Sequence, residues 1–262
     1  MRRLDRTVLS TNNSAPSLDV GYRSLAKRRI GIRKGEVSLI AAQSGVGKST
    51  LALSMTMRSK APTIYFSADT HAHTMEMRTI AMLTNTPQET VETLIAQDRQ
   101  WAADVIKQAS HIKWNFDSAP DVTLIENEIK AHIELTSHAP ELVVVDNLTD
   151  CIVDSGNEYA EMKAMLKDFK YLAREYDTAF LVLAHVSDGV IVTDGQCPPK
   201  GKILGQIGAT PCLILTLAQW NDHLGVCPVK NRYGKASPAG NDVSWLSYAP
   251  DTMQVGELEV AA

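Results

Sequence analysis

The chain has 262 residues, of which 44% are hydrophobic and 21% charged, with a formal net charge of −4 and a pI of about 6.0. This length suffices for one large α/β domain, and the charge balance excludes a globally basic body that binds nucleic acid over its whole surface. The four cysteines lack C-x-x-C spacing and no apolar run is long enough for a membrane span, so we expect reduced thiols, a cytoplasmic location and no membrane contact.

The chain begins with a polar segment that predicts a flexible arm. Residues 1–17 are rich in Ser, Thr and Asn and contain Pro16. Residues 18–29 predict a short helix, and residues 32–36 predict a turn into the first strand, at 37–42. We therefore place the arm at 1–17 and a single α/β domain at 18–262.

The next segment carries the strongest motif. The apolar strand 37–42 leads into a glycine-containing loop that ends in Gly-Lys-Ser and opens a helix at 49–59. Backbone N–H groups of such a loop converge on phosphate oxygens, and the dipole of the following helix favours an anion at its N-terminus. The residues expected to bind a nucleotide are Gln43, Ser44, Gly45, Val46, Gly47, Lys48, Ser49 and Thr50.

Within this loop, Lys48 is expected to reach the β- and γ-phosphates, and the Ser49 hydroxyl to hold Mg²⁺. Gly45 and Gly47 permit a positive φ and a close approach of the backbone to phosphate. Ala42 stands where the common pattern G-x-x-x-x-G-K-[ST] has its first glycine. A chance match in a Gly/Ser-rich turn is the alternative, but strand, loop, lysine, hydroxyl and helix all occur in the required order.

Strands and helices alternate along the rest of the domain. The predicted strands lie at 63–67, 111–116, 141–146, 179–185, 212–217, 225–230, 243–246 and 253–255. The predicted helices lie at 74–83, 87–110, 122–137, 157–176 and 203–209, and 187–202 predicts a long loop. This order predicts an α/β fold in which helices flank a mostly parallel, twisted sheet.

Acidic residues follow two of these strands, at the edge where open α/β sheets bind their ligands. Asp146 ends the strand 141–146, where it fits a ligand that holds Mg²⁺ through water, and an ordinary turn-starting Asp is the alternative. Asp69 follows the strand 63–67 and is the preferred carboxylate for activating water. Glu76, inside the next helix, is the alternative, and Asp69 suits the N-cap of that helix equally well.

Two further strand ends carry polar side chains. His185 ends the strand 179–185, where it can contact the γ-phosphate and relay its loss to the next loop, although a strand-end His is more often a satisfied polar residue. Lys230 and Arg232 are two residues apart near the tip of the strand 225–230, so they share one face and can contact phosphate oxygens together. A solvated basic hairpin is the alternative.

The sum of these motifs resembles the RecA-like P-loop ATPase core of DnaB-type replicative helicases, and is similar to the helicase halves of phage helicase-primases. The resemblance covers about residues 18–250 and rests on the runs AQSGVGKS (42–49), FSAD (66–69), VVVDN (143–147), LAH (183–185) and KNRYG (230–234). The family often carries Ala at the first position of its phosphate loop, so Ala42 agrees with the match.

The resemblance implies a homo-oligomeric ring, usually a hexamer, with ATP and Mg²⁺ bound between subunits. It makes Asp146 the Walker B acid and His185 the polar sensor. Asp69 stands where the family usually has the catalytic Glu of F-S-L-E. Lys230 and Arg232 match the cations that reach the γ-phosphate of the neighbouring subunit, where an arginine stabilises transition-state charge.

The family also implies single-stranded DNA in the channel of the ring, held by the loops 149–157 and 187–202. The second loop contributes Lys200 and Lys202, whereas Asp residues in both loops repel phosphate. These acids are Asp150, Asp154, Asp188 and Asp194. Residues 1–36 precede the first predicted strand, and we expect no room among them for the N-terminal helicase or primase domain that is usual in the family.

Three functions follow from the sequence. The first is a ring-forming ATPase that translocates on single-stranded DNA, as a helicase or helicase-like protein in phage or bacterial DNA replication. The second is a recombination ATPase of the RecA/RadA type. The third is a RecA-fold ATPase that does not bind DNA and whose nucleotide controls oligomerisation. The KNRYG run favours the first over the second, and the acidic loops keep the third open.

Overall fold

A computed structural model of the chain describes residues 16–151, 157–187 and 195–258. Of the arm predicted at 1–17, only the last two residues lie in this part, and Ser17 belongs to a short strand, β1 (Ser17–Leu18), which pairs with β2 (Ile32–Arg33). Within the described residues, no helix combines the length and apolar composition that crossing a membrane requires.

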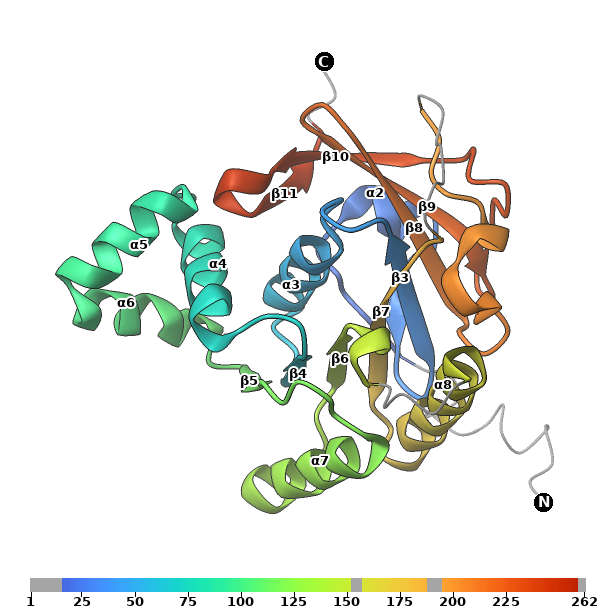
Figure 1. Ribbon diagram of the computed structural model, residues 1–262, viewed down its shortest axis with the longest axis horizontal. Helices are drawn as coiled ribbons and strands as arrows, with labels where there is room; N and C mark the ends of the chain where they lie inside the picture. The colour runs from blue at the N-terminus through green and yellow to red at the C-terminus, as the bar shows by residue number, and fades with distance from the viewer. Residues whose placement is uncertain (1–15, 152–156, 188–194, 259–262) are drawn as a thin grey trace.

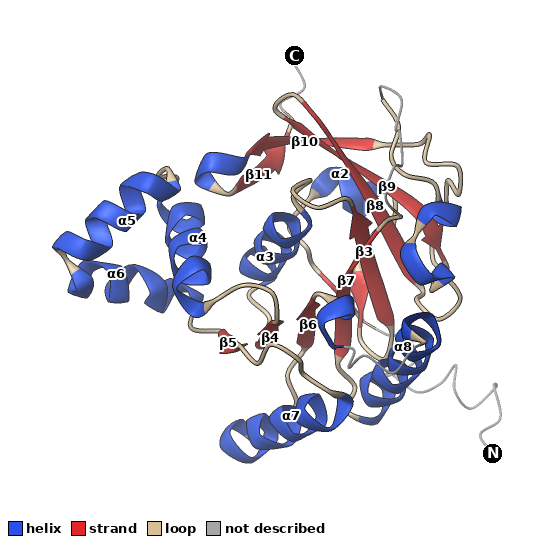
Figure 2. Ribbon diagram, viewed as in Figure 1, coloured by secondary structure: helices blue, strands red, loops and turns tan. Residues whose placement is uncertain are grey.

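The described part of the chain is built on one nine-stranded mixed sheet (Figures 1 and 2), in the order β11-β10-β9-β8-β3-β7-β6-β4-β5. Neighbours from β8 to β5 pair in parallel, and β9, β10 and β11 extend the sheet in antiparallel pairs. The strands are β3 (Val37–Ala42), β4 (Thr63–Ser67), β5 (Ile112–Asn115), β6 (Leu142–Asp146), β7 (Ala179–His185), β8 (Leu213–Trp220), β9 (His223–Asn231), β10 (Ser244–Ala249) and β11 (Gln254–Glu257). The predicted α/β fold with a mostly parallel sheet is confirmed.

Helices cover both faces of the sheet, as Figure 1 shows. Along β3, Ile40 and Ala42 pack into a core with α3 (Lys48–Ser59), whereas Leu39 and Ala41 pack into a second core with α8 (Glu158–Glu175) and α7 (Val122–Thr136). Side chains alternate between the faces because the repeat of a strand is two residues. Every residue of β3 is buried, so this strand forms the centre of the sheet.

The two helices that pack into the second core, α7 and α8, each begin at a residue whose side chain caps the helix. Asp121 accepts a hydrogen bond from the backbone N–H of Leu124 at the start of α7. Asn157 does the same for Ala160 at the start of α8. Such caps satisfy N–H groups that have no partner inside the helix.

The predicted helix at 87–110 is wrong in one respect, because it is two helices. Chain order gives α4 (Ala72–Thr84), α5 (Gln88–Gln97), α6 (Arg99–Ile106) and the short 3₁₀ turn η1 (Lys107–Ala109). Asp98 separates α5 from α6 with an extended backbone (φ −144°), and its side chain accepts from the N–H of Trp101. Asp competes with the helix in this way, so it both ends α5 and caps α6. Together α4, α5 and α6 form a lobe beside the sheet, on the left in Figure 2.

Smaller differences occur at other irregular positions. The helix predicted at 18–29 is only α2 (Arg23–Lys27), and the predicted turn at 32–36 contains β2. The helix predicted at 203–209 is a single 3₁₀ turn, η4 (Leu204–Gln206), because Gly205 adopts a left-handed backbone (φ 70°). The other 3₁₀ turns are η2 (Leu148–Cys151), η3 (Lys200–Lys202) and η5 (Pro250–Thr252).

The register of the parallel strands gives the sheet two chemically distinct edges. At the carboxyl edge, Ala42 lies opposite His185 and Ser67 opposite Asp146. At the amino edge, β8 begins beside Ser38, and its Leu213 lies opposite Asn231 at the end of β9. The strand ends that carry the predicted chemistry therefore divide between opposite edges of one sheet.

The second core depends on aromatic packing between α8 and β7, where the rings of Phe169 and Phe180 stack with their centroids 5.2 Å apart. We expect Phe169→Ala to lower the free energy of unfolding by about 3–5 kcal/mol, since it leaves a cavity in a fully buried site. Tyr171→Ala, on the same helix but 64% exposed, should change it by less than about 0.5 kcal/mol. Chemical denaturation of both variants measures the difference, and equal losses would contradict this account of the core.

Candidate functional site

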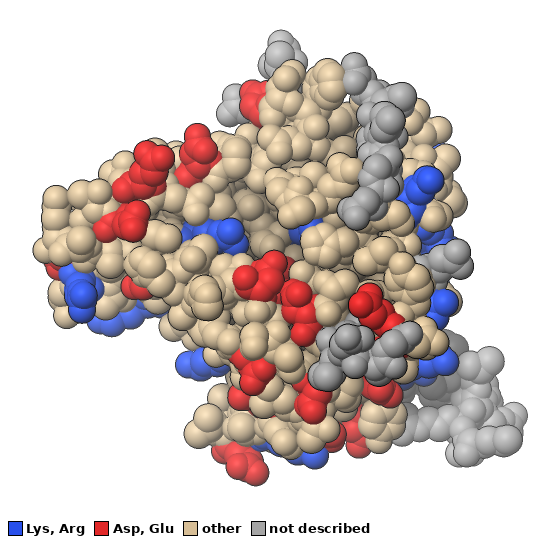
Figure 3. All heavy atoms as spheres, in the orientation of Figure 1, with Lys and Arg blue, Asp and Glu red and all other residues tan. Residues whose placement is uncertain are grey.

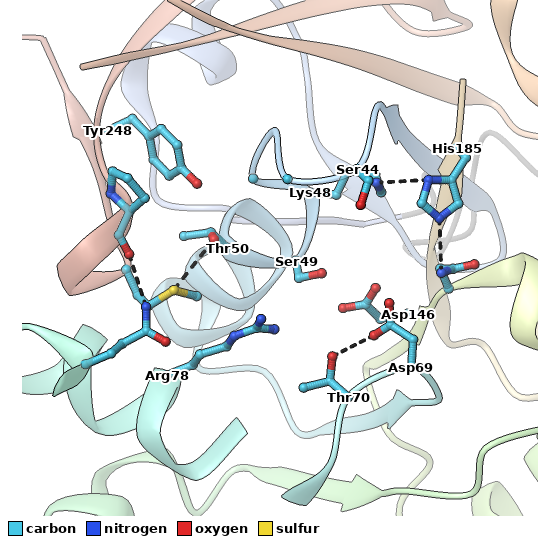
Figure 4. A pocket seen from close by; sticks show the side chains of 16 residues that line it. Ser44, Lys48, Ser49, Thr50, Asp69, Thr70, Arg78, Asp146, His185 and Tyr248 are labelled. Carbon is cyan, nitrogen blue, oxygen red and sulfur yellow. Dashed lines mark hydrogen bonds between the residues drawn. The ribbon is translucent and has the colours of Figure 1, made fainter. Parts of the chain in front are cut away.

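A cavity of about 280 Å³ opens at the carboxyl edge of the sheet (Figure 4). Its floor is the predicted phosphate loop, of which Ser44, Gly45, Gly47, Lys48, Ser49 and Thr50 line the cavity. Of the other two predicted residues, Val46 packs against the core and Gln43 turns its backbone carbonyl to Lys48. The remaining walls come from the residues after β4, from the ends of β6 and β7, from α4 and the start of α5, and from β10 and the segment that follows it.

The backbone of the loop explains both its glycines and its alanine. Gly47 has φ +103° and is the N-cap of α3, and a Cβ there would lie 2.8 Å from the hydroxyl oxygen of Tyr248. Any side chain at this position would be strained and would fill the space above the loop. Ala42, in contrast, still belongs to the extended strand β3 and buries its methyl group in the core, so this position needs no glycine.

Lys48 lies across the loop in a nearly buried position. Its Nζ donates to the carbonyl oxygens of Ala42 (3.3 Å) and Gln43 (3.2 Å). Burial lowers the pKa of Lys48, and the negative charges of Asp146 and Asp69 act in the opposite direction. An ammonium held by neutral carbonyls beside two carboxylates is placed to transfer its hydrogen bonds to an anion.

Asp146 is the most perturbed acid of the cavity. It is 2% exposed, and burial raises its pKa to about 6, although a hydrogen bond with Ser49 acts to lower it. Tyr65 is fully buried, and its own pKa is raised. Its hydroxyl donates a hydrogen bond to Asp146 Oδ2 at 3.0 Å. Desolvation thus makes this carboxylate a strong candidate for a cation ligand, and sets it apart from an ordinary turn-starting Asp.

His185 connects Lys48 to the loop after β6. Its Nδ1 lies 3.4 Å from Lys48 Nζ, and its Nε2 lies 3.3 Å from the side-chain nitrogen of Asn147 (Figure 4). The oxygen of the Asn147 side chain accepts from the backbone N–H of Thr149, which fixes the orientation of the amide. A neutral imidazole accepts only one hydrogen bond, so it cannot bond fully to both neighbours at once.

Asp69 lies in the cavity, opposite Ser49 and near Asp146 in Figure 4. Its Oδ1 accepts a hydrogen bond from the Thr70 hydroxyl at 2.6 Å. It does not cap the next helix, because the N-cap of α4 is His71. Glu76, the alternative base, is absent from the described lining of the cavity and instead pairs with His73 on the surface of α4.

Several residues that line the cavity were not predicted as site residues, and they are Thr70, Arg78, Gln88, Asn147, Tyr248, Pro250 and Met253. Arg78 points into it from α4, and Tyr248 stands over the loop from β10 (Figure 4). Arg78 is the one charged residue in the stretch Met77–Leu83. This pattern would indicate a residue of the cavity only if it were known which way the helix faces. Tyr248 gave no signal, because nothing local shows that an antiparallel strand near the C-terminus folds back over residue 47.

Lys230 and Arg232 lie at the amino edge, away from this cavity, so the two predicted phosphate cations do not contact the loop of their own chain. Lys230 Nζ donates to the carbonyl oxygens of Gly208 (2.9 Å) and Ala209 (2.8 Å). Arg232 pairs with Glu36 and has a side chain that is 46% exposed.

The two predicted DNA loops are described only in part. In the first, Asp150 belongs to η2 and its pKa is raised by burial and by Asp69, while Asp154 lies outside the described residues. In the second, Lys200 and Lys202 lie in η3, while Asp188 and Asp194 lie outside. On the face shown in Figure 3, basic side chains flank the central hollow and acidic side chains gather below it, and no continuous basic stripe crosses the described residues on this face.

The residues present fit a nucleotide and Mg²⁺. The cavity offers a hydroxyl (Ser49) and a buried carboxylate (Asp146), which are the hard oxygen ligands that Mg²⁺ prefers alongside phosphate and water. The N-terminus of α3, Lys48 and Arg78 supply positive charge for phosphates. Among the described residues, no cluster of three or more His, Cys, Asp or Glu side chains fits a metal.

Comparison of the sequence with known proteins agrees with this geometry. The sequence profile described as "DnaB-like helicase C terminal domain" matches residues 17–200. "Gene 65 protein" of Mycobacterium phage L5 is 32% identical over 248 residues, which cover 90% of this chain and 91% of the relative. "Replicative DNA helicase DnaB" of Buchnera aphidicola (subsp. Schizaphis graminum) is 24% identical, and the match covers 70% of this chain but 42% of that longer protein.

Comparison with solved structures concerns the fold alone, because the sequence identities are low. "The Structure Of A DnaB-Like Replicative Helicase And Its Interactions With Primase" superposes with a TM-score of 0.82 and 16% identity, over 98% of this chain and 67% of that one. "Crystal structure of the RadB recombinase" superposes with a TM-score of 0.62 and 16% identity, over 92% and 100%. One fold thus serves both a helicase and a recombinase, so the fold does not decide between these functions.

The burial of Asp146 has a consequence for stability. In metal-free protein, Asp146→Asn should raise the free energy of unfolding at pH 8 by up to about 3 kcal/mol, because it removes a carboxylate whose pKa of about 6 is above its ordinary value of 3.8. The gain should shrink as the pH falls from 6 towards 4, where the native carboxyl is protonated. Denaturation in EDTA at several pH values measures it, and a gain that grows towards low pH would contradict the assignment.

Proposed function

Because the chain belongs to the family of the DnaB-like helicase C-terminal domain, we propose that it is an ATP-hydrolysing motor that acts on single-stranded DNA. In this proposal its copies form a ring, usually a hexamer in such proteins, and ATP with Mg²⁺ binds between subunits. Helicase or translocase activity in DNA replication is the specific role that the family suggests.

The position of Arg232 carries the proposal. The phosphate loop lies at the carboxyl edge of the sheet, and Arg232 lies at the amino edge with a half-exposed side chain. Lys230 is engaged by two carbonyl groups of its own chain, so Arg232 is the better candidate for the group that reaches a neighbour. A head-to-tail arrangement brings opposite edges of successive copies together and closes into a ring when the rotation permits.

The residues of the cavity then divide the work of hydrolysis. Lys48 and Arg78 contact the phosphates, and Ser49 and Asp146 hold Mg²⁺, which neutralises charge that develops on the phosphates. Asp69 is the preferred carboxylate to orient the attacking water and accept its proton, since it lines the cavity whereas Glu76 does not.

His185 serves as the sensor in this proposal. Its ring contacts Lys48 on one side and Asn147 on the other, and it can accept from only one of them. When Lys48 turns to a phosphate, Nδ1 is released, and the ring can accept from Asn147 through Nε2 instead. Asn147 precedes η2 and the loop 149–157, so the change reaches a segment proposed to hold DNA.

A second candidate remains, in which nucleotide binding controls assembly without DNA. The observation that favours it is the charge of the proposed DNA loops, where the described part of the first contributes Asp150 and no cation. Lys200 and Lys202 of the second are the described cations that a DNA strand would contact. Binding through so few cations predicts weak affinity for DNA with a shallow salt dependence, because both grow with the number of phosphates that the protein neutralises.

Two substitutions test separately the phosphate loop of one subunit and the arginine that a neighbouring subunit is proposed to supply. Lys48→Ala should abolish turnover and weaken nucleotide binding, because it removes a phosphate contact. Arg232→Ala should lower kcat by about 10³-fold and leave nucleotide binding nearly unchanged, because an arginine supplied in trans stabilises the transition state alone. Steady-state turnover and nucleotide titration measure both effects, and loss of binding in Arg232→Ala would indicate a structural role instead.

DNA dependence and assembly test the motor itself. Turnover per subunit should rise with protein concentration as particles assemble, and should rise further with single-stranded DNA. Native particle mass with and without nucleotide and DNA, measured beside turnover, checks both expectations. If turnover is the same with and without single-stranded DNA, only the second candidate remains. Strand displacement from a forked duplex distinguishes a helicase from a recombination ATPase.

A further inference from the structure

Glu36 is a nearly buried carboxylate at the amino edge of the sheet, immediately before β3, with a side chain that is 9% exposed. Two cations from different elements contact it. Lys170 Nζ, on α8, lies 3.3 Å from Oε2, and Arg232 Nη1, just beyond β9, lies 3.6 Å from Oε1. The hydroxyl of Tyr233 donates to Oε1 at 3.5 Å. Glu36 is therefore the meeting point of three segments that are far apart in the sequence.

The contacts of Glu36 are not those of a fully satisfied structural ion pair. Burying a carboxylate is costly unless hydrogen bonds compensate it. Yet Oε2 has no hydrogen-bond partner within the described residues, although Lys170 is near, and the 3.6 Å between Arg232 and Oε1 is an ion-pair distance too long for a hydrogen bond. The carboxylate thus attracts two cations without binding either tightly, and this leaves the Arg232 guanidinium able to make stronger bonds elsewhere.

The surroundings of Arg232 explain why it needs such an anchor. The pKa of Lys230 is lowered, first by burial and then by the nearby positive charges of Lys200 and Arg232, with Lys170 contributing further. These cations repel one another, and Glu36 is a carboxylate that pairs with two of them, Lys170 and Arg232. A long side chain that is 46% exposed loses considerable conformational freedom when it is held in one place. An ion pair that holds it in advance reduces this cost at the moment of reaction.

We propose that Glu36 is a positioning residue that holds Arg232 at the amino edge, ready to contact the phosphate bound by a neighbouring copy. The inference rests on the proposed function, because it requires Arg232 to act in trans. Arg232 approaches Glu36 through Nη1 at 3.6 Å, and its planar fork carries further donors that can bind an anion. Glu36 itself acts only through Arg232 and has no contact with the nucleotide of either subunit.

The test removes the negative charge of the Glu36 side chain and keeps the shape of that side chain. Glu36→Gln should lower kcat of the assembled protein about tenfold or more, with KM and nucleotide affinity unchanged, since a misplaced catalytic group costs rate and not binding. Lys170→Gln is the matched control, because it removes the other cation of the same carboxylate and leaves Arg232 paired. It should keep kcat near that of the natural chain. Glu36→Asp, which keeps the charge but retracts it, should fall between the two and serves if Glu36→Gln does not fold.

Subunit mixing separates positioning in trans from damage to the strand β3. Lys48→Ala subunits lack a working phosphate loop but keep an intact Arg232 for their neighbour. Mixed with Glu36→Gln subunits, they should give more turnover than the sum of the two preparations alone. Arg232→Ala mixed with Lys48→Ala is the reference, and it should recover in the same way.

The outcomes distinguish this inference from the proposed function. Natural kcat in Glu36→Gln, a raised KM, or no recovery on mixing while the Arg232→Ala reference recovers would each overturn the role of Glu36 alone. Natural turnover in Arg232→Ala, or no recovery in the reference mixture, would overturn action in trans and the inference with it. An equal loss of kcat in Lys170→Gln would show that the network is structural.

Discussion

The parallel register of the central strands is the constraint that organises both the fold and its chemistry. Because β3, β4, β6 and β7 run in the same direction, the phosphate loop, Asp69, Asp146 and His185 all emerge at the same edge. Parallel strands require crossover connections, and the helices of these connections bury both faces of the sheet. The cavity is thus a consequence of strand direction, and its polar residues stand on a rigid, fully buried support.

The same constraint separates charges that would otherwise act within one subunit. Lys48 and Asp146 share a desolvated cavity, where each perturbs the pKa of the other. Arg232 is held at the opposite edge, beside Glu36. A positive group this far from the phosphate loop of its own chain is useful to catalysis only if another copy brings its nucleotide to it. Under the proposed function, each site is therefore shared between two copies of the chain.

Much of the fold followed from local patterns. The strands Val37–Ala42, Thr63–Ser67 and Ala179–His185 were predicted with the bounds that the structure shows, because each is an apolar run between strong breaks. The prediction was wrong where one side chain overrides a periodic pattern. Asp98 divided a predicted helix by capping the second half, and Gly205 ended another after one turn. The spacing of apolar residues indicates which face of a helix is buried. It does not show where a side chain or a glycine interrupts the backbone of the helix.

Local sequence was enough to place the predicted phosphate loop, Asp146 and His185 at one edge of the sheet, since spacing and strand polarity determine these positions. The packing of distant elements was needed to show that Asp69 lines the cavity and Glu76 does not, and that Arg78 and Tyr248 complete its walls. It was needed again to bring Glu36 to Arg232. The direction of a helix and the fold-back of a strand are set by long-range contacts, so the spacing of nearby residues does not encode them.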